Sequence, residues 1–172
     1  MKIIECVPNF SEGRNLQTVE ALAAVLRKVS GIKLLDVSAD ADHNRCVLTF
    51  IGSPERIVEG ALAVSEEALA RIDMRLHEGI HPRIGAVDVV PFVPLGDASM
   101  SDAVAAAHRF GREYAAKTAV PVYFYGEAAL QADRKQLPAV RRGGYEGLEE
   151  RFKNPAWRPD AGAPVFHVQG GA

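Results

Sequence analysis

The short connection between two apolar segments, residues 34–37 and 46–52, places the strongest limit on the fold. The segments LLDV and CVLTFIG have the composition of strands, and only the polar residues SADADHNR separate them. Parallel neighbouring strands need a crossover of about a dozen residues or more, usually a helix. A connection this short therefore predicts that the two strands run antiparallel.

Apolar residues at helical spacing predict three helices around this pair of strands. Residues 16–29 carry an apolar residue every three or four positions and follow Asn15, whose side chain is a favourable N-cap. Residues 54–76 repeat the pattern after a Ser-Pro pair, which places a capping hydroxyl before a proline at the first helical position. Ser99 and Asp102 have the spacing of a capping box and predict the start of a third helix.

Three more strands are predicted, at residues 2–7, 86–93 and 120–126, and Pro91 indicates an edge or a bulge in the second of them. The first six elements are then strand, helix, strand, strand, helix and strand. This order predicts an α+β fold, a ferredoxin-like split β-α-β sandwich in which a mixed or antiparallel sheet carries its helices on one face. A doubly wound parallel sheet is the alternative.

The last third of the chain is polar and irregular. Residues 131–153 are expected to form pieces of helix that Pro138 and the pair Gly143–Gly144 interrupt. Residues 154–172 are rich in Pro and Gly and are expected to form an extended strap. The sequence thus indicates one domain, residues 1–153, followed by a tail.

Composition and charge limit the classes of function. A formal charge of -2 without a cluster of Lys and Arg argues against a nucleic-acid partner. No apolar run has the length of a membrane span or the form of a signal peptide, so no membrane partner and a cytoplasmic location are expected. Cys6 and Cys46 lie in strand-like apolar segments, where a buried, reduced thiol is the usual state.

The segment HEGIH, from His77 to His81, spells the H-E-x-x-H of zinc hydrolases. That motif requires a helix, so that both histidines lie on one face. Gly79 in the middle and Pro82 directly after His81 oppose a helix, because proline pushes the preceding residue toward extended geometry. No metal site is therefore expected here.

Polar residues gather in three loops of the expected structure, with the sequences VPNFSEGRN, SADADHNR and HEGIHPRIG. These segments, followed by AVDVVPFVPL, PVYFYGEAA and LPAVRRGGYEGL, resemble the amino-terminal subdomain of glutamate formiminotransferases. The resemblance runs over nearly the whole chain and is densest in the block H-x-G-x-H-P-R-x-G-x-x-D. It implies that residues 1–153 form this subdomain and that the tail, residues 154–172, leads toward a carboxy-terminal subdomain.

The resemblance implies transfer of the formimino group from N-formiminoglutamate to tetrahydrofolate, a step of histidine degradation. Tetrahydrofolate is then a co-substrate, and no metal takes part. In the family the substrates lie between two subdomains. A homodimer, or a separately encoded carboxy-terminal subdomain, is therefore the expected partner beside these small molecules.

His81 matches the family's catalytic histidine. An imidazole titrates near neutral pH and can serve first as general base and then as general acid, which suits a reaction that removes one proton and delivers another. His77 is expected either to orient the loop or to cap the carboxyl end of the preceding helix.

Substrate binding is expected from Arg45 and Arg83, because a guanidinium matches a carboxylate in two places and formiminoglutamate carries two carboxylates. Either arginine could instead form an ordinary surface ion pair. Three neighbours in the loop before Arg45 are further candidates, and a solvated turn with Asx hydrogen bonds is their alternative. They are Asp42, His43 and Asn44.

Two other functions remain open at the level of sequence. One is a folate-binding or partner-binding half-enzyme that has no turnover alone. The other is transfer of a formyl group between glutamate and a folate, which the same histidine would serve. A departure from the family's pattern, Ser38 at a position that is acidic in animal members, leaves the role of the SADADHNR loop open.

Overall fold

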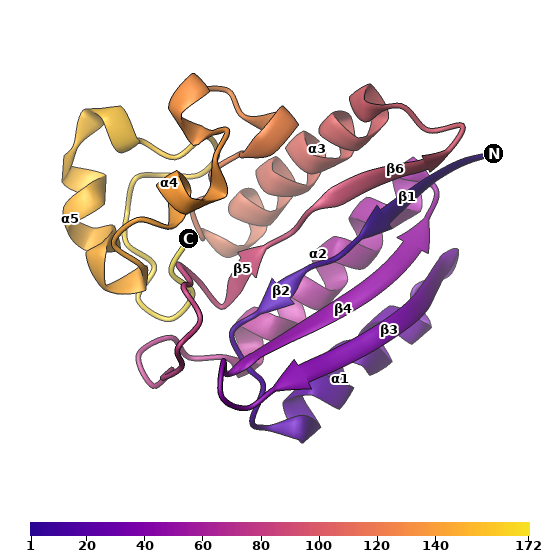
Figure 1. Ribbon diagram of the computed structural model, residues 1–172, viewed down its shortest axis with the longest axis horizontal. Helices are drawn as coiled ribbons and strands as arrows, with labels where there is room; N and C mark the ends of the chain where they lie inside the picture. The colour runs from indigo at the N-terminus through magenta and orange to yellow at the C-terminus, as the bar shows by residue number, and fades with distance from the viewer.

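Six strands form one sheet in the computed structural model, which describes residues 1–172 (Figure 1). The strands are β1 (Lys2–Cys6), β2 (Asn9–Phe10), β3 (Ile32–Asp40), β4 (Arg45–Gly52), β5 (Val87–Val89) and β6 (Phe92–Gly96). They lie in the order β5-β2-β4-β1-β6, with β3 paired to β4. Every pairing is antiparallel, so the predicted β3–β4 pair is confirmed. Of the two expected kinds of sheet the antiparallel one is present, whereas a mixed sheet and the parallel alternative are wrong.

The reason for the antiparallel sheet lies in where each helical connection ends. The helix α1 (Leu16–Lys28) joins β2 to β3, and β4 lies between these two strands. The helix α2 (Pro54–Arg71) joins β4 to β5, and β2 lies between them. Each crossover therefore leaves room for one strand of opposite direction, and no parallel neighbours arise.

The three long helices cover one face of the sheet, as expected (Figure 1). The third is α3 (Met100–Thr118). Alternate strand residues point to opposite faces, and Ile4, Cys6, Leu48 and Phe50 are fully buried in the core that these helices share with the sheet. Both cysteines are buried free thiols, and burial raises the pKa of Cys46 to about 12.

The predicted helix starts are confirmed. Asn15 Oδ1 accepts hydrogen bonds from the backbone N–H groups of Gln17 at 3.1 Å and Thr18 at 3.2 Å. Ser99 and Asp102 form both halves of the capping box. These caps depend on neighbouring residues only, which is why the sequence contains them in readable form.

The predicted end of α2 is wrong, because the helix stops at Arg71 instead of continuing to residue 76. The tail supplies the reason. Gln169 Nε2 donates to the carbonyl oxygens of Leu69 at 2.7 Å and Ile72 at 3.3 Å, and the Gln169 carbonyl accepts from Met74 N–H at 3.0 Å. A residue about a hundred positions away thus satisfies the orphan carbonyl groups of the last turn.

The strand predicted at residues 86–93 is broken into β5 and β6 around Pro91, the residue that indicated an irregularity. The strand predicted at 120–126 is absent. Only one isolated bridge forms there, between Val122 and Ala161, while Phe124 N–H donates to Asp160 Oδ2 at 2.8 Å. The strap thus satisfies backbone groups that the prediction assigned to the sheet, and Tyr123 and Phe124 are both buried.

The rest of the chain forms short helical pieces beside β5 and α3, drawn in orange and yellow in Figure 1. They are α4 (Leu137–Arg141), α5 (Leu148–Lys153) and the 3-10 turns Gly126–Ala128, Ala132–Arg134, Tyr145–Gly147 and Pro155–Trp157. Gly143 and Gly144 break them at φ of 86° and 61°, as predicted, whereas Pro138 lies inside α4. No helix has the length and apolar character needed to cross a membrane.

Candidate active site

Three loops meet at one end of the sheet: residues 11–15 before α1, residues 41–44 between β3 and β4, and residues 72–86 between α2 and β5. Two glycines permit the close approach. A methyl group on Gly13 would lie 2.3 Å from the Asp40 carbonyl oxygen, and one on Gly79 would lie 2.5 Å from that of His43. Larger residues would separate the loops.

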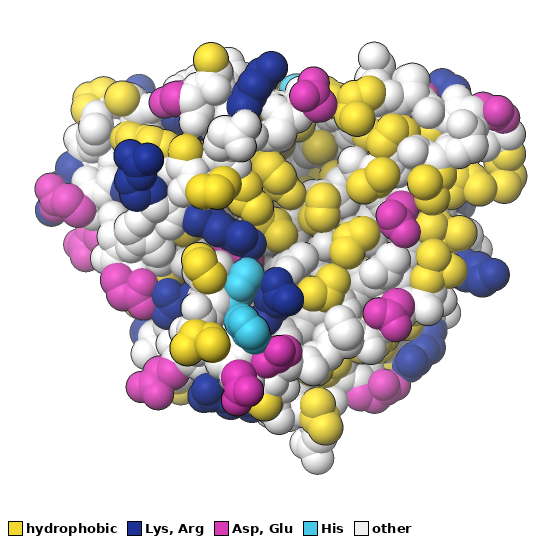
Figure 2. Space-filling view, in the orientation of Figure 1, with side chains coloured by type: hydrophobic (Ala, Val, Ile, Leu, Met, Phe, Trp, Pro, Cys, Tyr) yellow, Lys and Arg dark blue, Asp and Glu magenta, His cyan; other side chains and the backbone are white.

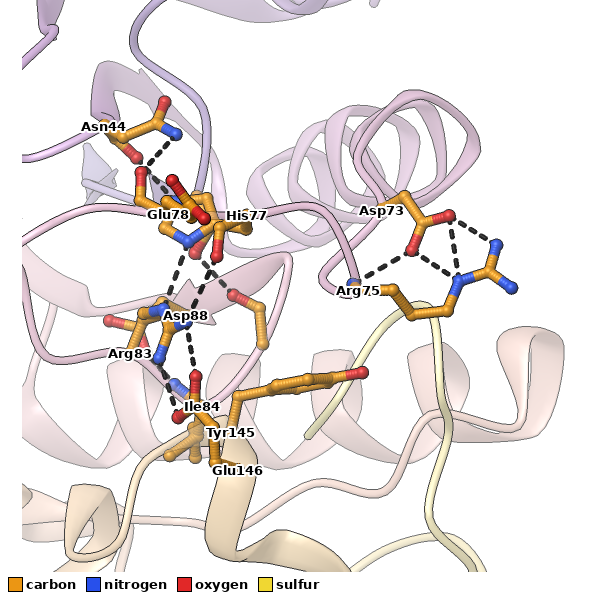
Figure 3. A network of polar contacts seen from close by, with 12 residues as sticks. Asn44, Asp73, Arg75, His77, Glu78, Arg83, Ile84, Asp88, Tyr145 and Glu146 are labelled. Atoms are coloured by element: carbon orange, nitrogen blue, oxygen red, sulfur yellow. Dashed lines mark hydrogen bonds and ion pairs between the residues drawn. The ribbon is translucent and has the colours of Figure 1, made fainter.

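Asn44 joins the three loops. Its Oδ1 accepts from Gly13 N–H at 2.9 Å, and its Nδ2 donates to the Glu78 carbonyl at 2.8 Å (Figure 3). The residue is 8% exposed and has a left-handed φ of 47°, which asparagine tolerates better than most residues. The side chain predicted to bind substrate is therefore engaged in holding the loops together.

His77 orients its loop, which was one of its two predicted roles. Its Nε2 donates to the Asn44 carbonyl at 2.9 Å and its Nδ1 accepts from Arg83 Nε at 3.1 Å, so the neutral ring carries its proton on Nε2 (Figure 3). The alternative role as a helix cap is wrong, because α2 has already ended at Arg71.

The guanidinium of Arg83 donates its hydrogen bonds to other residues of the protein. Its Nη1 and Nη2 meet the carboxylate of Glu146 at 3.0 Å and 2.7 Å, and Nη2 also reaches the His77 carbonyl at 3.4 Å (Figure 3). The hydrogen bond from Arg83 lowers the pKa of Glu146. The two Nη groups of Arg83, which could hold a substrate carboxylate, are thus occupied by Glu146 in the 3-10 turn Tyr145–Gly147.

His81 lies on the same loop and faces two charged side chains. Its Nε2 lies 3.5 Å from Arg45 Nη1 and 3.9 Å from Asp88 Oδ2, and its side chain is 16% exposed. Figure 2 looks onto the uncovered face of the sheet and shows histidine side chains near its centre, flanked by basic side chains. The structure therefore brings together two residues that the sequence placed in different loops, Arg45 and His81.

The surroundings of His81 keep its ring neutral. Burial lowers the pKa of His81 to about 4, and the positive charges of Arg45 and Arg141 act in the same direction, as do His43 and His77. At neutral pH the imidazole is consequently unprotonated and has a free lone pair. That is the form a general base requires.

Asp88 and Arg141 are site residues that sequence reasoning missed. The Asp88 side chain is 2% exposed, its Oδ1 accepts from Ile84 N–H at 2.9 Å, and its Oδ2 forms an ion pair with Arg141. Burial raises the pKa of Asp88, and the contact with Arg141 opposes that shift. One carboxylate within the apolar strand AVDVV is the sequence feature that could have indicated it.

The turn between β3 and β4 has the Asx geometry that was the alternative prediction for it. Asp40 Oδ1 accepts from the backbone N–H groups of Asp42 and His43, both at 2.9 Å, which lowers the pKa of Asp40. Asp40 Oδ2 also lies 2.9 Å from His43 Nδ1. The His43 ring lies 6.1 Å from that of His81, whereas Asp42 is exposed at the tip of the turn.

A pocket of about 240 Å³ opens next to these side chains, between β5, α3 and residues 122–128. Its walls are mostly apolar and include Val87, Phe110 and Tyr125, and Asp88 contributes a charged group. Figure 2 shows a hollow with hydrophobic side chains beside the histidines. The charged groups around His81 therefore adjoin an apolar cavity.

The tail contacts the loop that carries His81 from the other side. Gly85 pairs with Gly171, Ala86 N–H donates to Gly170 O at 2.9 Å, and Ala172 N–H donates to Ile84 O at 3.1 Å. A methyl group on Gly85 would lie 2.3 Å from the Ala172 carbonyl oxygen. Both glycines of the block H-x-G-x-H-P-R-x-G-x-x-D thus allow another backbone to pass.

The fold and the site define a class: an α+β domain whose loops surround a neutral imidazole with guanidinium groups and one buried carboxylate, an arrangement suited to proton transfer beside an anionic ligand. The chain belongs to the formiminotransferase family. Residues 3–172 match its "Formiminotransferase domain, N-terminal subdomain".

Individual relatives agree with this assignment. The chain is 51% identical over 171 residues to the formimidoyltransferase-cyclodeaminase of Gallus gallus, covering 99% of this chain and 32% of the relative. It is 42% identical over 172 residues to the glutamate formimidoyltransferase of Thermoplasma acidophilum, covering 99% of this chain and 57% of that protein. The enzyme of the same name from Streptococcus pyogenes is 38% identical over 170 residues, with 99% and 57% covered. The chain thus spans about a third to somewhat over half of these relatives.

Proposed function

We propose that the chain takes part in formimino transfer from N-formiminoglutamate to tetrahydrofolate, which gives 5-formiminotetrahydrofolate and glutamate. The observation that carries the proposal is the neutral His81 ring held between Arg45 and Asp88. The names of the relatives, which are formimidoyltransferases, support the same reaction. Tetrahydrofolate is the co-substrate, and the step belongs to histidine degradation in the cytoplasm.

The reaction needs two proton transfers at one place. Nitrogen 5 of the folate attacks the formimino carbon, a tetrahedral intermediate forms, and the nitrogen of glutamate leaves as an amine. His81 takes the proton from the attacking nitrogen as general base and returns it to the leaving nitrogen as general acid. The ring thus ends each cycle in the neutral state in which it began.

Arg45 is the better candidate for a substrate carboxylate than Arg83. Arg45 Nε is buried without a hydrogen-bond partner, whereas the Arg83 fork already meets Glu146. A carboxylate bound at Arg45 would also offset part of the positive charge around His81. The pKa of His81 then rises from about 4 toward neutrality, where proton transfer is most effective.

The substrates lie, in this proposal, between residues 1–153 and a carboxy-terminal subdomain that follows the strap, residues 154–172. The uncovered face of the sheet supports a partner there, because Leu35, Val93 and Leu95 are each at least 39% exposed. The same observation favours the second candidate, a half-enzyme that binds folate or its partner without turnover alone. A homodimer would supply the cover from a second copy.

The ferredoxin-like description of the fold also stays a proposal. It is supported by the two split crossovers, in which β4 lies between β2 and β3, and β2 lies between β4 and β5. The breaks at β1–β2 and β5–β6 are departures from an unbroken four-stranded sheet.

The test is the absorbance-monitored formation of 5-formiminotetrahydrofolate by the chain alone and by the chain mixed with the part of the Thermoplasma acidophilum relative that it does not match. His81→Ala is the site variant, and Arg27→Ala, an exposed change on α1, is its control. Turnover that needs the second part identifies the half-enzyme. The proposal is contradicted if folded His81→Ala has full turnover, or if neither the chain alone nor the mixture has any turnover.

A further inference from the structure

We infer that Asp88 is the positioning residue of this site: its carboxylate, fixed by Arg141 and by the Ile84 N–H, is the counter-ion of His81 when that ring is protonated. The inference rests on the proposed role of His81 and assigns a partner to the imidazolium that this role creates. Arg141 and the Ile84 N–H both favour the charged form of Asp88.

The contacts at His81 Nε2 decide which nitrogen is the base. A guanidinium has only donors, so Arg45 Nη1 at 3.5 Å can approach Nε2 favourably only while this nitrogen carries a lone pair. The neutral ring therefore has its proton on Nδ1, and Nε2 is the basic atom. After Nε2 accepts a proton it has no acceptor left for Arg45 and faces Asp88 Oδ2, 3.9 Å away, as a donor.

Asp88 is the only carboxylate within ion-pair distance of His81. The groups that lower the pKa of His81 are all basic: Arg45 on β4, Arg141 on α4, and His43 and His77 in the loops around the ring. The Asp40 carboxylate lies beyond His43, with which it forms an ion pair. Without Asp88 the imidazolium would form among positive charges in a largely buried site, which is unfavourable. The carboxylate thus supplies the compensating charge.

The fixed position of Asp88 makes it suitable as a counter-ion. Oδ1 is held by the Ile84 N–H at 2.9 Å and Oδ2 by Arg141, and the side chain is 2% exposed. The carboxylate therefore has neither water nor free rotation to weaken its effect on the ring. Arg141 has two opposing actions, because it holds the carboxylate and also repels the proton on His81.

The reaction needs no proton from outside, because His81 returns to the leaving nitrogen the same proton that it takes from the folate. The neutral ring begins with Nδ1–H, Nε2 takes the proton released by folate nitrogen 5, and the ring becomes an imidazolium beside the Asp88 carboxylate. The same proton then goes from Nε2 to the leaving nitrogen of glutamate. No proton passes to Asp88 and none is exchanged with another residue.

The test measures the pKa of His81 by NMR titration of its ring carbon-bound protons, in the chain without substrate. Asp88→Asn retains an acceptor for the Ile84 N–H and removes the charge, so the proton affinity of His81 should fall at least tenfold. Arg141→Met removes the repelling cation, so the affinity should rise at least tenfold. Asp73→Asn removes a carboxylate of the same loop that pairs with Arg75, and should leave His81 unchanged.

The expected shifts of the His81 pKa have opposite signs in the two variants. Structural damage would instead move the pKa of His81 in both variants toward that of an unfolded histidine. An unchanged pKa of His81 in folded Asp88→Asn overturns the inference. If that variant does not fold, an unchanged pKa in Arg141→Met overturns it instead. Because the titration uses no substrate, its outcome is separate from that of the turnover test with His81→Ala, whose failure would remove the proposed function alone.

A kinetic measurement follows where turnover is found. Loss of the counter-ion should lower kcat about tenfold or more in Asp88→Asn and leave the KM for N-formiminoglutamate within about twofold, because Asp88 acts on the proton transfer and not on substrate carboxylates. Asp88→Glu, which keeps the charge, should recover part of kcat. A rise of KM with unchanged kcat contradicts the inference.

Discussion

The side-chain amide of Asn44 donates to the backbone carbonyl of Glu78 over 2.8 Å and so ties the β3–β4 turn to the loop that carries His81. The hydrogen bond from Gly13 N–H to Asn44 Oδ1 is buried, the bond to Glu78 is partly buried, and the backbone of Asn44 is left-handed. One side chain therefore contacts both neighbouring loops and helps to fix the positions of all three.

We expect Asn44→Ala to lower the free energy of unfolding by about 2–4 kcal/mol, because it leaves buried partners unsatisfied and places a less tolerant residue at positive φ. Urea unfolding measures the change, with exposed Asp42→Ala as the control within about 0.5 kcal/mol. If Asn44 binds substrate and does not hold the loops, stability stays the same and only the KM rises.

The tail crosses Gly85, where its backbone leaves no room for a side chain. Gly85→Ala places a methyl group against the backbone oxygens of Ala172 and Gly170, so we expect a loss of about 1–3 kcal/mol and release of residues 167–172 from the loop. Hydrogen exchange at the Ala172 amide, which donates to Ile84 O, reports the release.

The matched control is Gly147→Ala, where a methyl group meets nothing within 4 Å and φ is -89°. That substitution should leave stability unchanged or slightly higher, because alanine has less freedom to lose on folding. Equal losses in the two variants would show that the tail does not constrain Gly85.

Substitution of the two arginines that were predicted to bind substrate should have different effects, one on the KM and the other on stability. Arg45→Met should raise the KM for N-formiminoglutamate about tenfold or more, since a charged hydrogen bond contributes about 1.5–3 kcal/mol, and should change stability little. Arg83→Met should instead lower stability, because it removes the partner of Glu146 and His77.

Glu146→Gln provides the control for Arg83, since both changes break the same contact and their effects on stability should not add. Kinetics on wild type, the three variants and the double variant Arg83→Met/Glu146→Gln, with urea unfolding beside them, measure both quantities. The assignment is wrong if Arg83→Met raises the KM while leaving the unfolding curve unchanged.

The sequence predicted those features whose causes lie within a few residues. The caps at Asn15 and Ser99 and the antiparallel β3–β4 pair are of this kind, because the capping groups and the short connection can be seen in the sequence itself. The end of α2 and the missing strand at residues 120–126 are of the other kind. Gln169 and Asp160 decide them from far along the chain.

In the candidate site, too, the features with local causes were predicted from the sequence, and those that depend on distant residues were not. The block around His81 was visible as a run of unusual residues, and the side chain lies in a loop as expected. Which arginine would be free could not be predicted, because Glu146 comes from another part of the chain to occupy Arg83. The ion pair of Asp88 with Arg141 depends on how α4 packs against β5, which no local pattern specifies.

The low pKa of His81 predicts how stability depends on pH. An unfolded histidine titrates near 6.5 and the folded one near 4, so between these values the unfolded chain binds more protons. Stability is then fully present above about pH 6.5 and decreases as the pH falls toward 4. Carboxylates whose pKa is lowered, such as those of Asp40 and Glu146, add their own losses at the acid end.

His81→Gln isolates the contribution of the histidine, because it removes the titrating ring and leaves the carboxylates in place. Urea unfolding at several pH values between 4 and 7 should give curves for wild type and variant that diverge steadily, with the variant losing less stability as the pH falls. Parallel curves would mean that folding leaves the pKa of His81 unchanged, and the imidazole would then be partly protonated at neutral pH before any substrate arrives.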